Sequence, residues 1–211
     1  SLNVPGLTGR VANVVLIAGG QGGFTTTLRW QPELRPRLND NWLNGEVSTT
    51  GKIAGTGVTL SLRNDANRNG HWGPERVFDG NGVLLFTRDE FATFSGDRPR
   101  LSAALARTTA NGNKWNLNLG GQLVYNDQSV DGVSVQPGFG LVRERFDFAE
   151  DEWNYDIGGD YELGLRGGRL KLIALRRFEH SPTVSTFVID RAVGGRVGNR
   201  FRQSADEGEA I

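Results

Sequence analysis

Lys114 to Tyr125 reads KWNLNLGGQLVY, and its alternation of apolar and polar residues decides the fold class. The apolar side chains occupy odd positions: Trp115, Leu117, Leu119, Leu123 and Tyr125. The even positions carry amides: Asn116, Asn118 and Gln122. A period of two is typical of a β-strand with one apolar and one polar face. Because an aromatic residue stands at each end of the apolar face, the stretch predicts a strand of a membrane barrel. Its apolar residues would face lipid and its amides the lumen.

The composition narrows the class of protein. The 211 residues carry 24 basic and 24 acidic side chains, so we expect no nucleic-acid partner. The 30 glycines have no collagen period and indicate many turns. A hydrophobic content of 37% is low for a soluble α/β enzyme and suits a barrel with a polar interior. Cysteine is absent, which excludes disulfide and thiolate chemistry.

Hydropathy offers no membrane helix. The longest uninterrupted apolar run, Val14 to Ala18, is too short for one, whereas barrel strands alternate and never form such runs. Ser1 to Arg10 shows no secretory signal, and the sequence contains no methionine. We therefore expect a piece of a longer chain.

Three strand hairpins with tight turns follow one another along the chain. The predicted arms are 43–53 with 57–64, 100–107 with 114–125, and 143–165 with 169–178. Their turns lie near Gly55, Asn111 and Gly167, each 56 residues from the next. Short turns that alternate with long loops are typical of outer-membrane barrels. The polar segments 65–98, 126–142 and 190–199 are the predicted loops, and the first contains a small hairpin at the turn Asp79 to Gly82.

The N-terminal part resembles a known family. Gly6 to Val15, GLTGRVANVV, is similar to the end of the plug domain of TonB-dependent outer-membrane receptors, and Trp153 to Leu175 resembles their barrel sequence. The resemblance implies an all-β fold, a segment of an antiparallel transmembrane β-barrel made of long meandering hairpins, with a short plug remnant at the N-terminus. Residues 1–22 would be the plug end, and residues 23–211 about eight strands of a barrel that has 22 in complete receptors.

The same resemblance implies a function. Receptors of this family sit in the outer membrane of Gram-negative bacteria and import scarce ligands such as ferric siderophores, cobalamin or glycans. Their energy comes from the TonB complex, which contacts a part of the plug absent from this sequence. The expected partners are therefore outer-membrane lipid, the TonB complex and a small siderophore-type ligand. The outer loops and the plug apices would capture that ligand.

Few residues suggest a site. His71 and His180 are the only histidines, and without clustered carboxylates or thiols they predict no metal centre. We also expect no cofactor and no catalytic residues, and interpret Glu150 to Glu152 as solvated acids. Arg196, Arg200 and Arg202 either steer an anionic ligand or are charges in the lumen or at the rim of the barrel. In the second case Asp206, Glu207 and Glu209 balance them. The candidates for ligand binding are His71, Trp72, Arg196, Arg200 and Arg202.

Two other classes stay open as alternatives. One is a small complete eight-stranded outer-membrane or lipocalin-like barrel with a structural or binding role. The other is an NAD-dependent enzyme, suggested by the glycine-rich segment Val14 to Gly23. Its glycine spacing differs from the dinucleotide-binding pattern, and Thr25 to Pro36 alternates and holds two prolines, which predicts a strand where that enzyme needs a helix. We therefore expect no enzymatic activity.

Overall fold

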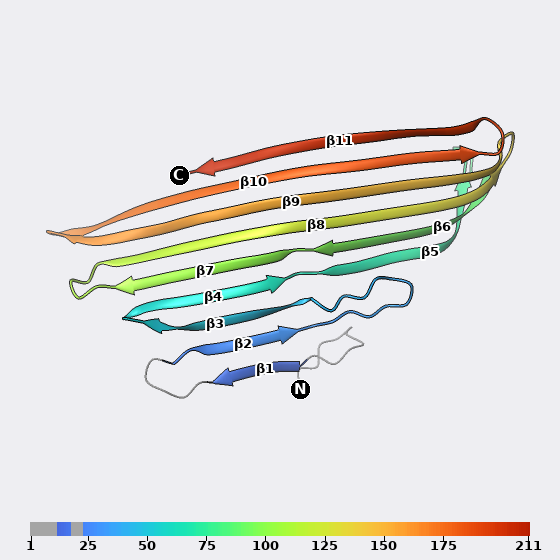
Figure 1. Cartoon of the computed structure of the whole chain (residues 1–211). Coiled ribbons are helices and arrows are strands. Elements are labelled where there is room, and N and C mark those ends of the chain that lie inside the picture. The colour runs from blue at the N-terminus through green and yellow to red at the C-terminus, as the bar shows by residue number, and fades with distance from the viewer. Residues whose placement is uncertain (1–11, 18–22) are drawn as a thin grey trace.

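The computed structural model describes residues 12–17 and 23–211, which form one antiparallel sheet of eleven strands (Figure 1). This confirms the predicted all-β antiparallel fold, although residues 23–211 form ten strands instead of about eight, and β1 is added from the predicted plug segment. The strands are β1 (Ala12–Ile17), β2 (Thr25–Trp30), β3 (Gly45–Ile53), β4 (Thr56–Asn64), β5 (Asn67–Phe78), β6 (Leu84–Asp97), β7 (Pro99–Thr108), β8 (Lys114–Gln136), β9 (Gly140–Leu165), β10 (Gly168–Arg191) and β11 (Gly195–Ala210).

The strand order follows the chain, with one elaboration in the middle. The order is β1-β2-β3-β4-β7-β8-β9-β10-β11, and β5 pairs with β6. The long strand β8 pairs with β7 through Lys114–Gln122 and with β6 through Tyr125–Ser134. The β5–β6 hairpin therefore prolongs the sheet beyond β4 and β7. In the described part of the chain the sheet is open, with β1 and β11 at its two edges (Figure 1).

The three predicted tight turns are confirmed and lie together at the left end of the sheet in Figure 1. The β3–β4 turn consists of Ala54 and Gly55, with φ angles of 47° and 81°. Two successive positive φ angles define the turn type whose twist matches that of a β-hairpin. The β9–β10 turn is equally short, because Leu165 pairs directly with Gly168.

The predicted long loops are wrong. Most of 65–98 forms β5 and β6, whose turn follows Phe78 as the Asp79 to Gly82 signal predicts. Strands β8 and β9 cover most of 126–142 and leave only residues 137–139 between them, and β10 and β11 cover most of 190–199. Polar residues and glycines interrupt the apolar positions of these segments, so the regular alternation that identifies a strand is missing. Hydrogen bonding to neighbouring strands holds them extended all the same.

The sheet has hardly any core of its own. Its accessible surface is 14592 Å², whereas about 9,600 Å² is typical of a folded globular monomer of this mass. Among the described residues only five apolar side chains are buried: Val58, Ala66, Ala92, Val124 and Val142. Both faces are thus available to something other than this chain.

The segment predicted as the plug end is described only in part. Within residues 1–22, Ala12–Ile17 form β1 and pair with β2, whereas residues 1–11 and 18–22, including most of the glycine cluster, lie outside the described residues. The segment after that cluster is a strand, β2, as predicted. Across residues 12–17 and 23–211, no helix has the length and apolar character needed to cross a membrane.

Candidate functional site

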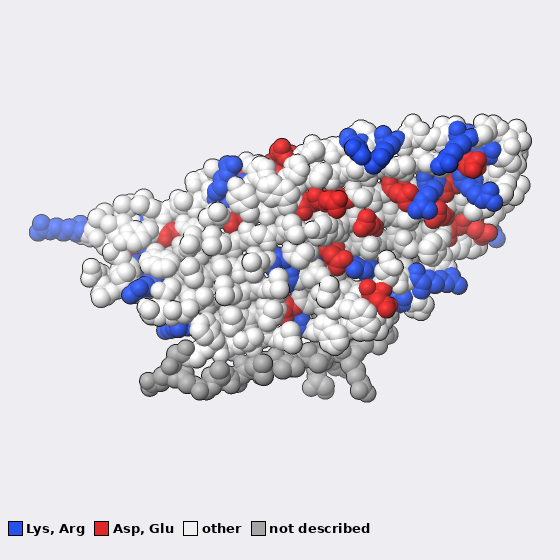
Figure 2. Space-filling view, in the orientation of Figure 1, with Lys and Arg blue, Asp and Glu red and all other residues white. Residues whose placement is uncertain are grey.

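One face of the sheet carries a broad apolar band. Strand register places directly opposite residues on the same face, and Leu62–Leu101, Leu105–Leu117 and Leu119–Ile157 are such pairs. Leu105 and Leu117 are half-buried, and the other four side chains remain exposed, Leu101 by 62% and Leu62 by 53%. A contiguous exposed apolar patch marks a surface that contacts a protein partner or a membrane. Figure 2 accordingly shows few charged atoms over the left half of the molecule, with both signs gathered toward the right-hand end.

Aromatic side chains lie at both ends of this band. Toward the tight turns, Trp115 on β8 pairs with Tyr161 on β9. At the other end, Trp153, Tyr155 and Phe178 form a cluster with ring centroids 5.2 to 6.4 Å apart. Along β8 the band runs over eleven residues from Trp115 to Tyr125, and these ten steps span ~33 Å. A strand tilted by about 40° covers ~25 Å of height over that length, the height of the apolar band of an outer-membrane barrel.

The opposite face is a ladder of polar pairs between strands. Asn116 donates to Asp160, and Arg100 forms an ion pair with Asp156. Farther along the same two strands, Asn126 donates to Glu150 at 2.6 Å. The predicted division of 114–125 into an apolar and an amide face is confirmed, because these amides bond across the face opposite Leu117 and Leu119. A face of hydrogen bonds and ion pairs between polar side chains is suited to a water-filled interior.

Beyond the aromatic cluster the polar face holds a charge network centred on Arg88 of β6. Its guanidinium binds Glu75 of β5, Glu90 of β6 and Glu144 of β9 at 2.5 to 2.7 Å. These carboxylates, with the hydrogen bond to Glu144 foremost, raise the pKa of Arg88 above its usual value. Buried Gly132 leaves the space for this side chain, since a Cβ there would lie 2.8 Å from Arg88 Cδ. The network ties the β5–β6 hairpin to β9.

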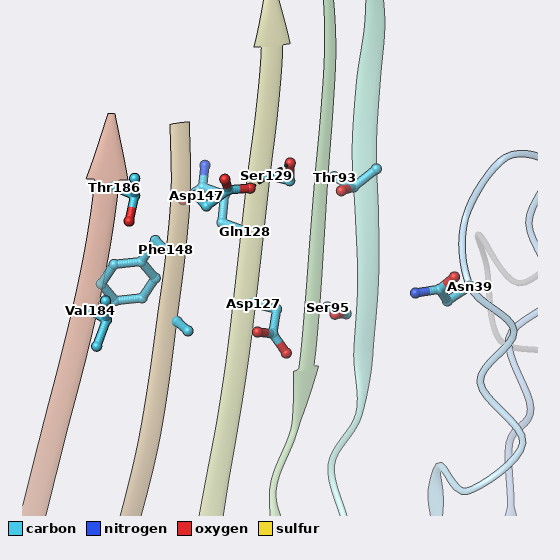
Figure 3. Close-up of a pocket in the computed structure, with 11 residues that line it drawn as sticks. Asn39, Thr93, Ser95, Asp127, Gln128, Ser129, Asp147, Phe148, Val184 and Thr186 are labelled. Atoms are coloured by element: carbon cyan, nitrogen blue, oxygen red, sulfur yellow. Dashed lines mark hydrogen bonds between the residues drawn. The ribbon is translucent and has the colours of Figure 1, made fainter. Parts of the chain in front are cut away.

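A polar groove lies between four strands and the β2–β3 loop, with a volume of about 290 Å³ (Figure 3). Its lining includes hydroxyl, amide and carboxylate groups together with an apolar floor: Asn39, Thr93, Ser95, Asp127, Ser129, Asp147, Phe148, Val184 and Thr186. The Ser129 hydroxyl donates to Asp147 at 3.1 Å, whereas the exposed Asp127 forms no ion pair within the described part of the chain. Such groups can bind a ligand rich in hydroxyls.

A contact with Arg145 favours the charged form of Asp147, one of the carboxylates that line the polar groove. Arg145 donates to both oxygens of Asp147, at 2.8 and 3.0 Å. This contact first, aided by Ser129, lowers the pKa of Asp147 below its usual range. Asp147 therefore stays a charged acceptor to a lower pH than an aspartate without such a contact.

The structure separates the candidates that the sequence suggested. His71 lies on β5, not in a loop, and contacts Glu90 of the Arg88 network at 2.7 Å. Trp72, the next residue, points to the other face, where the Arg37 guanidinium lies 4.9 Å above its ring. The histidines are far apart in register, since His180 pairs with Trp153 and binds Asp206. Among the described residues no group of His, Asp and Glu has the geometry to hold a metal ion.

Two of the three candidate arginines lie next to the polar groove. Arg200 pairs with Thr186 and Arg202 with Val184, so both extend the groove face onto the edge strand β11. Arg196 lies four residues beyond, opposite Asp190. The groove residues Asp127 and Ser129 were missed by sequence reasoning, because residues 126–142 were assigned to a loop. Their odd numbering, continued from the strand 114–125, was the available signal.

No protein-family model matches this chain, and no curated protein sequence matches it.

Proposed function

We propose that this chain forms part of the barrel wall of a TonB-dependent outer-membrane receptor that takes up a scarce small ligand. The observation that carries the proposal is the segregation of the two faces over a height of ~25 Å. Lipid would cover the face of Leu117, Leu119 and Ile157. The ladder of Asn116, Asp160 and their neighbours would line the lumen.

The length of the strands supports a receptor over a simple membrane anchor. Strands β8, β9 and β10 have 23, 26 and 24 residues, whereas about 9–11 suffice to cross a bilayer. The surplus lies beyond the aromatic cluster and would form an extramembrane wall. The polar groove and the adjacent Arg200 and Arg202 lie in that wall, on the face that carries the apolar band farther along the strands, so they would belong to its outer surface and not to the lumen.

The open edges also favour a larger assembly. Strands β1 and β11 each present one row of backbone groups without a partner strand in the described sheet. Unpaired backbone groups in hydrocarbon cost several kcal/mol each, so a sheet of this kind in a bilayer needs further strands to close it. In the proposed receptor these strands complete the barrel, and the TonB complex acts through a plug inside it.

The two alternative functions, a small eight-stranded barrel and a soluble lipocalin-like binder, differ from the receptor in strand number or in the surroundings of the two sheet faces. A barrel of eight strands does not match the eleven described. A soluble lipocalin-like binder would turn the same apolar face inward and leave the amides in water. The orientation of Leu119 therefore discriminates between a membrane wall and a soluble binder.

The absence of cysteine makes that test direct. Single Leu119→Cys and Asn118→Cys variants, neighbours on opposite faces, are expressed in a Gram-negative host and treated in isolated outer membranes with a water-soluble maleimide. We expect Asn118→Cys to be labelled and Leu119→Cys to be protected until the membrane is dissolved in denaturant. The reverse pattern, or recovery of the folded chain in the soluble fraction, would overturn the proposal.

A further inference from the structure

A second groove of about 780 Å³ lies where the apolar band meets the β2–β3 loop. Its apolar lining comes from three neighbouring strands and the loop: Leu28, Trp30, Trp42, Leu43, Val47 and Leu62. Leu28 pairs with Val47, and Val47 with Leu62, so the floor is one row across the sheet. That row continues into Leu101 and therefore into the apolar band itself. An occupant of the groove would enter from the side on which the band faces.

The wall of the groove is fixed by hydrogen bonds. Trp30 and Trp42 stack with centroids 6.5 Å apart, and Trp30 Nε1 donates to the carbonyl oxygen of Trp42 at 2.7 Å. The loop is closed by paired backbone bonds between Glu33 and Asn41, at 2.8 and 2.9 Å. The two indoles are thus held over the end of the apolar floor, as interface tryptophans are held at the edge of a bilayer.

The other end of the groove is polar but electrically balanced. Asp97 accepts from Arg68 at 2.8 Å and from Asn64 at 3.1 Å. Arg29, at the side, pairs with Glu46 at 3.5 Å. Because each cation has a carboxylate partner, the groove offers no net charge to a free anion. Its polar end suits an uncharged group such as an ester.

Asn41 supplies a second sign that a polar group belongs here. It lines the groove and is only 1% exposed, and neither its side-chain nitrogen nor its side-chain oxygen has a hydrogen-bond partner among residues 12–17 and 23–211. The Nε of Arg68, also in the lining, lacks a partner as well. Buried donors and acceptors without partners are rare in folded proteins and usually mark a ligand or an ordered water.

We propose that this groove binds one molecule of a membrane glycerolipid. An acyl chain would lie along Leu28, Val47 and Leu62, and the ester region would lie beside the tryptophans and Asn41. The inference rests on the proposed function, since the groove opens onto the face assigned to the bilayer. A lipid fits because its parts match the groove in order. The acyl chain would lie on the apolar floor, the ester beside the two indoles, and the headgroup next to the balanced ion pairs.

The five tryptophans allow a direct measurement. In a variant with Trp72, Trp115 and Trp153 changed to Phe, only Trp30 and Trp42 fluoresce. The protein is reconstituted in bilayers with a rising mole fraction of phosphatidylcholine brominated on its acyl chains, which quenches indoles by contact. We expect quenching to saturate at a mole fraction several-fold below that for a lipid that merely surrounds the protein. Quenching in linear proportion to the mole fraction would overturn the lipid site.

A matched pair of variants tests the position of the site. Leu62 and Leu101 are cross-strand partners on one face, both more than half exposed, but only Leu62 lines the groove. We expect Leu62→Gln to weaken the selective quenching about tenfold, because a polar floor loses part of the chain's transfer free energy, and Leu101→Gln to leave it unchanged. Equal effects of the two variants would overturn the site.

Failure of the lipid site is distinguishable from failure of the proposed function. The chain with all five tryptophans carries Trp115 and Trp153 at the two ends of the band. Quenching of Trp115 and Trp153 in wholly brominated bilayers, with only proportional quenching of Trp30 and Trp42, would support the proposed membrane-spanning sheet. The same result would contradict the lipid site. If no tryptophan is quenched, both the proposed membrane-spanning sheet and the lipid site are contradicted.

Discussion

Leu119 of β8 and Ile157 of β9 lie directly opposite each other, at 37% and 46% exposure, and no second layer formed by the described residues covers them. Their chain neighbours Asn118 and Gly158 form the adjacent pair and face the other way. The pair lies midway between the aromatic ends of the band. A soluble protein would gain from covering such a pair, whereas a bilayer covers it without any further structure.

A charge at Leu119 tests this position energetically. Leu119→Arg should lower the free energy of unfolding in lipid vesicles by about 2–4 kcal/mol, because the guanidinium would lie near the middle of the hydrocarbon. Asn118→Arg, one residue away on the polar face, should change it by less than about 1 kcal/mol. Urea unfolding followed by tryptophan fluorescence measures both variants. Equal losses would place neither face in lipid.

The Arg88 network should determine the local stability of the β5–β6 hairpin. Arg88→Gln leaves Glu75, Glu90 and Glu144 close together without their cation, so we expect a local loss of about 1–3 kcal/mol. Amide hydrogen exchange across β5 and β6 should become about tenfold or more faster, while exchange in β3 and β4 stays unchanged. Arg76→Gln is the control, because Arg76 forms no ion pair among the described residues. Unchanged exchange in Arg88→Gln would show that hydrogen bonds between the strands suffice.

The part of the fold assigned to the membrane could be predicted from the sequence. Between Trp115 and Tyr125 one face of the strand is apolar and the other polar, which leaves a period of two in the residue types. The tight turns near Gly55 and Gly167 were predictable for a related reason, since their backbone geometry favours glycine. These signals are local, and each can be recognised within about a dozen residues.

The extramembrane half could not be predicted in the same way. From Asn126 to Ser129 every residue is polar, so this stretch carries no alternation of apolar and polar residues. Its extended form depends on register with Gly96 to Thr93 on one side and Glu150 to Asp147 on the other, both distant in sequence. The polar groove, whose residues come from five segments, depends on that long-range pairing. The sequence shows its residues but not their proximity.

The β3–β4 turn carries a correctable strain. Ala54 has a φ of 47°, in the left-handed region that disfavours a side chain unless it is short and polar. Ala54→Asn creates the Asn-Gly pair preferred in this turn, so we expect a stabilisation of about 0.5–1 kcal/mol. The midpoint of urea unfolding should rise. Ala110→Asn in the β7–β8 turn is the control, since Ala110 has no positive φ and should gain nothing.

Acid should weaken the polar groove through Asp147. Arg145 and Ser129 hold its folded-state pKa below the unfolded value of about 3.9. The contact between Arg145 and Asp147 therefore stabilises the folded protein fully at pH values above the unfolded-state pKa. This contribution to the free energy of unfolding is lost as the pH falls through the lower folded-state pKa. Arg145→Gln should raise the pKa of Asp147 toward its usual value, measured by carbon NMR of the side-chain carboxyl. Arg143→Gln, on the same face of β9, should leave it unchanged. An equal rise of the pKa in both variants would mean that the combined electrostatic field of the nearby charges, and not the Arg145 contact, lowers the pKa of Asp147.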